Sequence, residues 1–341
     1  MKKGIIFLLV ILMLVPVVMT FASGAQQGGT QRYAFVFKNT GNPYGEKQMG
    51  GFKDGIEEQG YEAILRAPDQ PTAEAQIQIV EQLITQKVAS IAITGNDFDA
   101  LQPVLTKAMD QGIKVLSADS AVNPKSRMVH INQADSEKIG RTLIQAAYDM
   151  AGGSGEIAIL SATSQASNQN LWIEWMKKEL SQNPDKYANL KLVRVAYGDD
   201  LRDKSVSETE GLLQSYPNLK VIIAPTTVGI AAASRVITDK GLIGKVKVTG
   251  LGLPSEMAEY IKNGACPYMF LWNPIDVGYL TAYAATALVS GEITGAAGEK
   301  FTAGRLGEFE VVKAPDGGTE VLLGAPFKFD PSNIDEWKDV Y

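Results

Sequence analysis

The stretch that decides the fold is AEAQIQIVEQLITQKVASIAIT, residues 73–94. In its first part apolar residues recur at helical spacing, which places them on one face of a helix: Ile77, Val80, Leu83 and Ile84. Its last part, residues 90–94, is a short apolar run that is typical of a buried strand. A helix with one apolar face followed by a buried strand is the repeating unit of a parallel sheet covered by helices.

The same alternation extends through two successive halves of the chain, and the Gly-rich segment at residues 152–155 interrupts it between them. The predicted strands are 33–38, 61–66, 90–94, 114–118, 128–132, 156–161, 190–196, 221–224, 246–250 and 268–272. The predicted helices are 45–59, 73–87, 98–111, 135–151, 169–182, 203–215, 228–240, 255–263 and 276–290. The sequence therefore predicts an α/β fold with two doubly wound parallel-sheet lobes.

The connection between the two predicted lobes is expected to consist of three chain crossings, near Gln133, Asn273 and Arg305. Three adjacent crossings form a hinge, and hinged closure over a ligand is a known device. The expected first lobe is 31–132 plus 274–305, and the expected second lobe is 133–273 plus 306–341.

The beginning of the chain has the pattern of a secretory signal peptide. Lys2 and Lys3 precede an apolar run at residues 4–19, and small residues follow up to Ala25. We expect residues 1–25 to be removed after export, the alternative being an uncleaved membrane anchor. The only cysteine, Cys266, is too far along the chain to carry a lipid after the signal, so we expect a free protein in a periplasm.

Composition and motifs argue against several classes of function. Without Lys2 and Lys3 the chain keeps 30 basic against 38 acidic side chains, which argues against nucleic acid and anionic membranes as partners. With one histidine, His130, and one cysteine, neither a His-based triad nor a transition-metal site is supported. Phosphate-loop and dinucleotide-binding fingerprints are incomplete. We therefore expect no enzyme, no metal and no cofactor.

Polar and aromatic side chains gather just after the predicted strands, where open parallel sheets bind ligands. Asp, Asn, Gln and Lys suit sugar hydroxyls, which both donate and accept hydrogen bonds, and aromatic rings cover the C–H faces of a sugar. Ordinary helix capping is an alternative for Asn42, Asp97 and Asp200, and core packing is one for Trp172 and Trp175. The predicted ligand-binding residues are Lys38, Asn42, Tyr44, Asp119, Asn132, Asn168, Gln169, Trp172, Pro225, Thr227, Trp272 and Asn273.

Several stretches resemble a known family over essentially the whole exported chain. They are INQAD (131–135), NQNLWIEWM (168–176), VTGLGLP (248–254), LWNPIDVGYLT (271–281), AGRLGE (303–308) and LLG (322–324). The family is the type I periplasmic sugar-binding proteins of ABC importers, in its rhamnose-binding subgroup, close to the proteins that bind the furanosyl quorum-sensing autoinducer.

The resemblance implies which residues contact the ligand. Lys38, Asp119 and Gln169 match residues that bind the autoinducer in those relatives. Asn168 stands where the relatives have aspartate, and Thr227 stands where they have alanine. Because a buried site rejects a ligand that leaves its polar groups unpaired, these two differences favour a deoxyhexose such as rhamnose over the autoinducer.

By analogy with ribose binders, the resemblance implies that Tyr44 stands where an aromatic residue stacks on the sugar. The implied function is a monomeric extracytoplasmic binding protein that closes around one monosaccharide and delivers it to an ABC permease. The alternatives are the autoinducer or another pentose or hexose as ligand, and a periplasmic glycosidase. For a glycosidase, the adjacent Asp199 and Asp200 are poor candidates, because neighbouring residues of an extended segment point to opposite sides.

Overall fold

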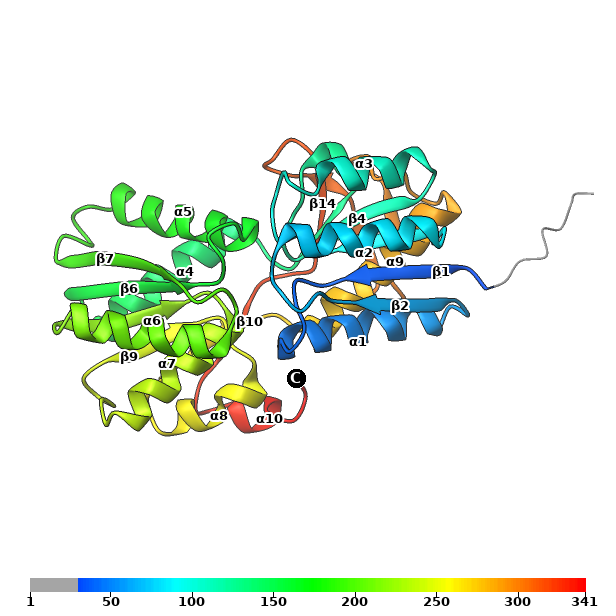
Figure 1. Ribbon diagram of the computed structural model, residues 1–341. Helices are drawn as coiled ribbons and strands as arrows, with labels where there is room; N and C mark the ends of the chain where they lie inside the picture. The colour runs from blue at the N-terminus through cyan, green and yellow to red at the C-terminus, as the bar shows by residue number, and fades with distance from the viewer. Residues whose placement is uncertain (1–29) are drawn as a thin grey trace, which may run out of the picture. The chain divides into compact units, whose positions relative to one another are not determined.

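A computed structural model describes residues 30–341, so the predicted signal peptide lies outside the described residues (Figure 1). Within the described range no helix is long and apolar enough to cross a membrane. Residues 31–341 form one compact unit that contains two sheets, parallel except for one antiparallel strand, Val312–Lys313, at the edge of the first. The predicted α/β class with two parallel-sheet lobes is confirmed.

The first sheet has seven strands and is buried on both faces. Phe35 packs into a core with residues of helices α1 (Pro43–Glu57) and α9 (Pro274–Ser290), whereas its neighbour Val36 packs into a separate core with α2 (Ala73–Thr85) and α3 (Gln102–Asp110). Successive strand residues point to opposite faces, so both must be apolar when helices cover both sides. The strand order is β13 (Val312–Lys313), β14 (Thr319–Leu322), β5 (His130–Asn132), β4 (Lys114–Ala118), β3 (Ser90–Ile93), β1 (Arg32–Val36) and β2 (Glu62–Arg66).

The second sheet has four parallel strands, in the order β7 (Leu190–Tyr197), β6 (Gly155–Ser161), β8 (Leu219–Ala224) and β9 (Lys247–Gly250). A short antiparallel pair, β10 (Met269–Leu271) with β15 (Phe327–Phe329), lies beside it through a bridge from Leu251 to Phe270. The helices of this lobe surround the sheet in Figure 1. They are α4 (Ser136–Ala151), α5 (Ser167–Gln182), α6 (Arg202–Ser215), α7 (Thr227–Asp239), α8 (Pro254–Lys262) and the short α10 (Ile334–Trp337).

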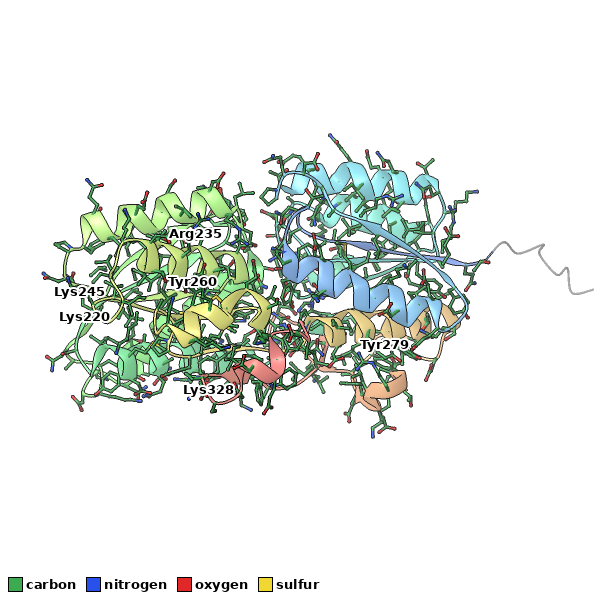
Figure 2. The ribbon with its side chains drawn as sticks, turned by 90° about the horizontal axis from the view of Figure 1, so that it is seen from below. Lys220, Arg235, Lys245, Tyr260, Tyr279 and Lys328 are labelled. Atoms are coloured by element: carbon green, nitrogen blue, oxygen red, sulfur yellow. The ribbon has the colours of Figure 1, made fainter. Side chains whose placement is uncertain are left out.

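Helices α1 and α9 approach so closely that only glycine fits at two of their contact positions, Gly51 and Gly278. A Cβ atom on Gly278 would lie 1.8 Å from the carbonyl oxygen of Gln48, and one on Gly51 would lie 2.0 Å from that of Ile275. Farther along α9 lies Tyr279, which is labelled in Figure 2. Its hydroxyl donates a hydrogen bond to Glu58, and the guanidinium carbon of Arg305 lies over its ring, 4.4 Å from the ring centroid. The helix carrying residues 274–290 is thereby fixed to the first lobe.

The end of the chain departs from the expected division. β14 pairs in parallel with β5, so that Val321 lies opposite Ile131 in the first sheet and is fully buried. The sequence analysis placed all of 306–341 with the second lobe and predicted no strand there. That boundary was wrong for residues 306–322. β12 (Glu308–Glu310) pairs with β11 (Lys300–Thr302) and contacts β14. These strands are too short to show a clear period, and β14 is held by a partner almost 190 positions away. The third crossing consequently follows Leu322 rather than Arg305.

Candidate functional site

The carboxyl ends of both sheets contribute to one cavity, which together with the open solvent at its mouth amounts to about 370 Å³ of space free of protein atoms. The cavity is lined by Phe37, Lys38, Asn42, Tyr44, Asp119, Asn168, Gln169, Trp172, Asp200, Pro225, Thr226, Thr227, Leu251, Leu271 and Trp272.

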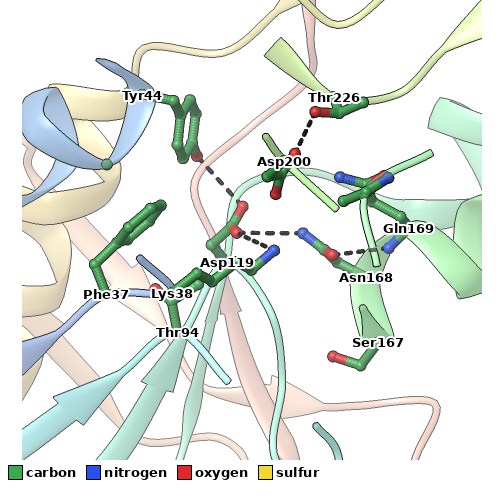
Figure 3. A network of polar contacts seen from close by, with 12 residues as sticks. Phe37, Lys38, Tyr44, Thr94, Asp119, Ser167, Asn168, Gln169, Asp200 and Thr226 are labelled. Atoms are coloured by element: carbon green, nitrogen blue, oxygen red, sulfur yellow. Dashed lines mark hydrogen bonds and ion pairs between the residues drawn. The ribbon is translucent and has the colours of Figure 1, made fainter. Parts of the chain in front are cut away.

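Asp119 is the centre of the polar contacts in this cavity (Figure 3). It follows β4 and is 6% exposed. Its Oδ2 lies 3.6 Å from Lys38 Nζ and accepts a hydrogen bond of 3.2 Å from Asn168 Nδ2, while Oδ1 accepts one of 3.4 Å from the Tyr44 hydroxyl. Since Asn168 belongs to α5 of the second lobe, Asp119 joins the two lobes directly.

A second carboxylate, that of Asp200, affects the pKa of Asp119. Burial raises the pKa of Asp119 above its ordinary value, the neighbouring Lys38 ammonium lowers it, and the charge of Asp200 raises it again. Asp200 comes from the loop after β7 of the second sheet, and its carboxylate accepts a hydrogen bond from the Thr226 hydroxyl. The cavity therefore contains two acidic groups, and Lys38 is the only basic side chain among the described residues that line it.

Both carboxylates sit on an unusual backbone. Asp119 has φ +61° and Asp200 has φ +54°, in the left-handed region that side chains other than those of Asn and Asp rarely adopt. Such a conformation costs about 1–3 kcal/mol and persists where the surroundings hold it. In both cases the strained residue directs a charged group to the wall of the cavity.

The start of helix α5 supplies two amides. The Gln169 carbonyl oxygen accepts hydrogen bonds of 2.8 Å from the Ser161 hydroxyl and from the Ala162 backbone N–H. Its NH2 group remains as the part of the side chain that is available to a ligand. Beside it, Ser167 donates a 2.8 Å hydrogen bond to the Ala121 carbonyl, a further contact between the lobes.

Three aromatic side chains enclose another part of the cavity. Trp272 Nε1 donates a 2.7 Å hydrogen bond to the Tyr44 hydroxyl, and the two rings meet edge to face at 6.5 Å. The Trp172 ring lies 5.8 Å from that of Trp272. Burial and the Asp119 charge raise the pKa of Tyr44 well above its usual range, so the phenol stays protonated and can donate to Asp119.

The structure places most of the predicted ligand-binding residues on this cavity, but not Asn132 and Asn273. The Asn132 side chain donates a 2.9 Å hydrogen bond to Glu320 of β14. Asn273 caps α9, where its side-chain oxygen accepts a 3.0 Å hydrogen bond from Ile275 N–H. Asn42 lines the cavity and also caps α1 through Tyr44 N–H, at 3.1 Å.

The sequence analysis did not select Phe37, Asp200, Thr226, Leu251 and Leu271, which also line the cavity. Asp200 and Thr226 follow the predicted strands 190–196 and 221–224, as the selected residues follow theirs, but helix capping was an equal alternative for Asp200. The structure gives α6 a different first residue, with Leu201 at its cap and no side-chain capping bond. The strand-end position was therefore the signal that could have identified Asp200.

The remaining reactive groups of the described chain lie elsewhere. His130 is buried and shares a 2.9 Å hydrogen bond with Ser117, and burial lowers its pKa to about 3. Cys266 is also buried, and burial raises the pKa of its thiol. Between residues 30 and 341 no group of three or more potential metal-binding side chains comes together.

Comparison with known proteins gives consistent matches. Residues 33–293 match the family described as periplasmic binding protein domain. A crystal structure of an ABC transporter solute binding protein from Clostridium phytofermentas with bound L-rhamnose is 52% identical, with a TM-score of 0.90 over 92% of this chain and 99% of that one. A sugar ABC transporter structure from Actinomyces odontolyticus is 40% identical, with a TM-score of 0.70 over 90% and 97% of the two chains. The D-ribose/D-allose-binding protein of Pseudomonas aeruginosa is 25% identical over 241 residues, 68% of this chain and 74% of that protein.

Proposed function

This chain belongs to the periplasmic binding protein family, and from that premise we propose that it binds L-rhamnose in the cavity between its sheets and delivers the sugar to an ABC importer. The relatives are transport proteins, so the chain is a binding protein rather than an enzyme. The identity of the ligand is supported by one observation above the others, the 52% identity to the L-rhamnose-bound protein over nearly the whole chain.

The contents of the cavity agree with this ligand. Asp119, Asn168 and Gln169 offer donors and acceptors for hydroxyl groups, and Trp172 and Trp272 offer apolar surface for C–H faces. A six-carbon deoxy sugar presents both kinds of surface.

The transport mechanism follows from the contact of both lobes with one cavity. A sugar held at once by Lys38 and Asp119 of the first lobe and by Gln169 of the second stabilises the arrangement in which the two sheets face each other. The permease then needs to recognise only that closed arrangement. The fraction of the protein that is closed is set by how much more tightly the sugar binds the closed arrangement than the open one. We further propose that residues 1–25 direct export to the periplasm, where the protein acts as a monomer.

The test is a ligand panel measured by thermal unfolding and calorimetry on the purified protein. L-Rhamnose at a hundredfold excess over Kd is expected to stabilise the folded protein by about 2.7 kcal/mol. D-Ribose, D-xylose, D-arabinose and the autoinducer are expected to give smaller shifts at the same concentration. A larger shift with any of these would overturn the assignment of rhamnose, and no shift with any sugar would overturn sugar binding itself.

A further inference from the structure

Two buried carboxylates from opposite lobes line the same cavity. Asp119, after β4, is 6% exposed, and Asp200, after β7, is 9% exposed. Asp119 has Lys38, Asn168 and Tyr44 as partners, whereas the one side chain that donates to Asp200 among the described residues is Thr226. A carboxylate can accept about four hydrogen bonds, so Asp200 retains unused acceptor capacity.

Thr226 fixes the direction of Asp200. Its hydroxyl donates to Asp200 and accepts a 3.4 Å hydrogen bond from Gly229 N–H at the start of α7. One oxygen of Asp200 is thus bound to the second lobe. Figure 3 shows Asp200 between Thr226 and the group formed by Asp119 and Asn168.

The cavity wall also contains a hydrogen-bond donor that has no partner among the described residues, the indole N–H of Trp172. Trp172 lines the cavity and is 2% exposed, and its Nε1–H has no acceptor within the described part of the chain. Leaving a buried N–H unpaired costs about 1–3 kcal/mol. A ligand oxygen that accepts from this indole would remove that penalty. The cavity therefore presents acceptors from both lobes together with a donor that lacks a partner.

We propose that Asp200 determines ligand specificity. Asp119 of the first lobe and Asp200 of the second lobe each accept a hydrogen bond from one hydroxyl group of the ligand. The proposal rests on the sugar-binding function above and adds that the ligand has two free hydroxyl groups at separate ring positions. A neutral polyol meets this requirement, and Trp172 then donates to one of its oxygen atoms. A sugar without the hydroxyl that faces Asp200 leaves a buried carboxylate oxygen unpaired and binds weakly.

The test combines Asp200→Asn with sugar analogues that lack single hydroxyl groups. Calorimetry measures Kd for L-rhamnose and for its 2-, 3- and 4-deoxy analogues, or for the corresponding analogues of whichever sugar the panel identifies. In the parent, the analogue without the hydroxyl that faces Asp119 and the analogue without the hydroxyl that faces Asp200 are each expected to bind at least about tenfold more weakly than the full sugar, the loss of one hydrogen bond to a charged group. The second of these is the deletion that tests Asp200. In Asp200→Asn the same deletion is expected to change Kd by less than about threefold, while the full sugar itself binds about tenfold more weakly than to the parent.

The neighbouring Asp199→Asn is a matched control. Asp199 has nearly the same backbone conformation, with φ +55°, but its carboxylate pairs with Lys204 and does not line the cavity. This variant is expected to behave like the parent with every analogue. Asp200→Gly serves as a second variant, because glycine adopts positive φ freely and removes the carboxylate without backbone strain.

The possible results separate the two proposals. If the parent binds sugar but both Asp200 variants keep the parental Kd and the parental penalty for every missing hydroxyl, the role of Asp200 is refuted and the proposed function stands. If the parent binds no sugar, the proposed function fails and the role of Asp200 fails with it.

Discussion

Replacement of Asp119 by asparagine tests the centre of the site. The carboxylate faces three partners, Lys38 Nζ at 3.6 Å, Asn168 Nδ2 at 3.2 Å and the Tyr44 hydroxyl at 3.4 Å. Asparagine keeps the shape of the side chain but removes the charge. Hydrogen bonds to charged groups contribute about 1.5–3 kcal/mol. The variant is therefore expected to bind L-rhamnose about 10- to 150-fold more weakly, measured as Kd by calorimetry.

The backbone at residue 119 allows the charge to be separated from the strain. Asp119 has φ +61°, which asparagine tolerates and alanine does not. Asp119→Asn is therefore expected to fold, whereas Asp119→Ala is expected to be less stable than Asp119→Gly by about 1 kcal/mol in the free energy of unfolding. Urea denaturation of the ligand-free variants measures this difference.

Two results would contradict this reasoning. Parental affinity in Asp119→Asn would show that the carboxylate does not bind the sugar. An equal loss of affinity in Asp199→Asn, whose charge lies outside the cavity on a similar backbone, would show that the effect is general and not local.

Three further predictions concern pH, helix packing and the contact between the lobes. The buried His130 has its pKa lowered to about 3, so the unfolded state takes up the extra proton first as the pH falls. The contribution of His130 to the free energy of unfolding is complete above pH 6.5 and decreases toward pH 3 by up to about 5 kcal/mol. Urea unfolding of His130→Gln across this range should show a smaller dependence of stability on pH than the parent shows. Gly51→Ala is expected to lower the melting temperature strongly, because its Cβ would lie 2.0 Å from a backbone oxygen, whereas Gly50→Ala, with open space around it in the same helix, should leave it unchanged or slightly higher. Asn168→Asp replaces a donor that lies 3.2 Å from the Asp119 carboxylate with a second carboxylate. Calorimetry should show that this variant binds rhamnose more weakly than the neutral variant Asn168→Ala does.

The alternation of strands and helices made the fold predictable from sequence. Both faces of the central strands are covered, so their apolar runs are continuous and easy to recognise, as for residues 90–93 and 221–224. The short strands near the end were not predictable in this way. Strand β14 is four residues long and includes Glu320, whose buried carboxylate accepts from Asn132 and has its pKa raised by burial. No local pattern indicates that such a segment belongs in a sheet.

The same dependence on distant contacts explains why two predicted site residues do not line the cavity. Asn132 follows a strand as a ligand-binding residue would, but Glu320 occupies its side chain, and that pairing is visible only in three dimensions. Asn273 precedes Pro274, and the resulting helix cap uses its side-chain oxygen. Asp200 shows the opposite case, since it follows a strand, lines the cavity and does not cap helix α6. Whether the residues on the cavity wall bind sugar remains a prediction.

The interleaved course of the chain has a consequence for biosynthesis. The sheet that begins at β1 acquires α9 only after residue 273 and β14 only after residue 318, with the whole four-stranded sheet made in between. Its nascent form therefore lacks an edge strand and a covering helix until most of the polypeptide has left the ribosome. Contacts between such distant segments slow folding. A chain with this topology therefore stays incompletely folded for longer than one whose lobes are each completed in turn.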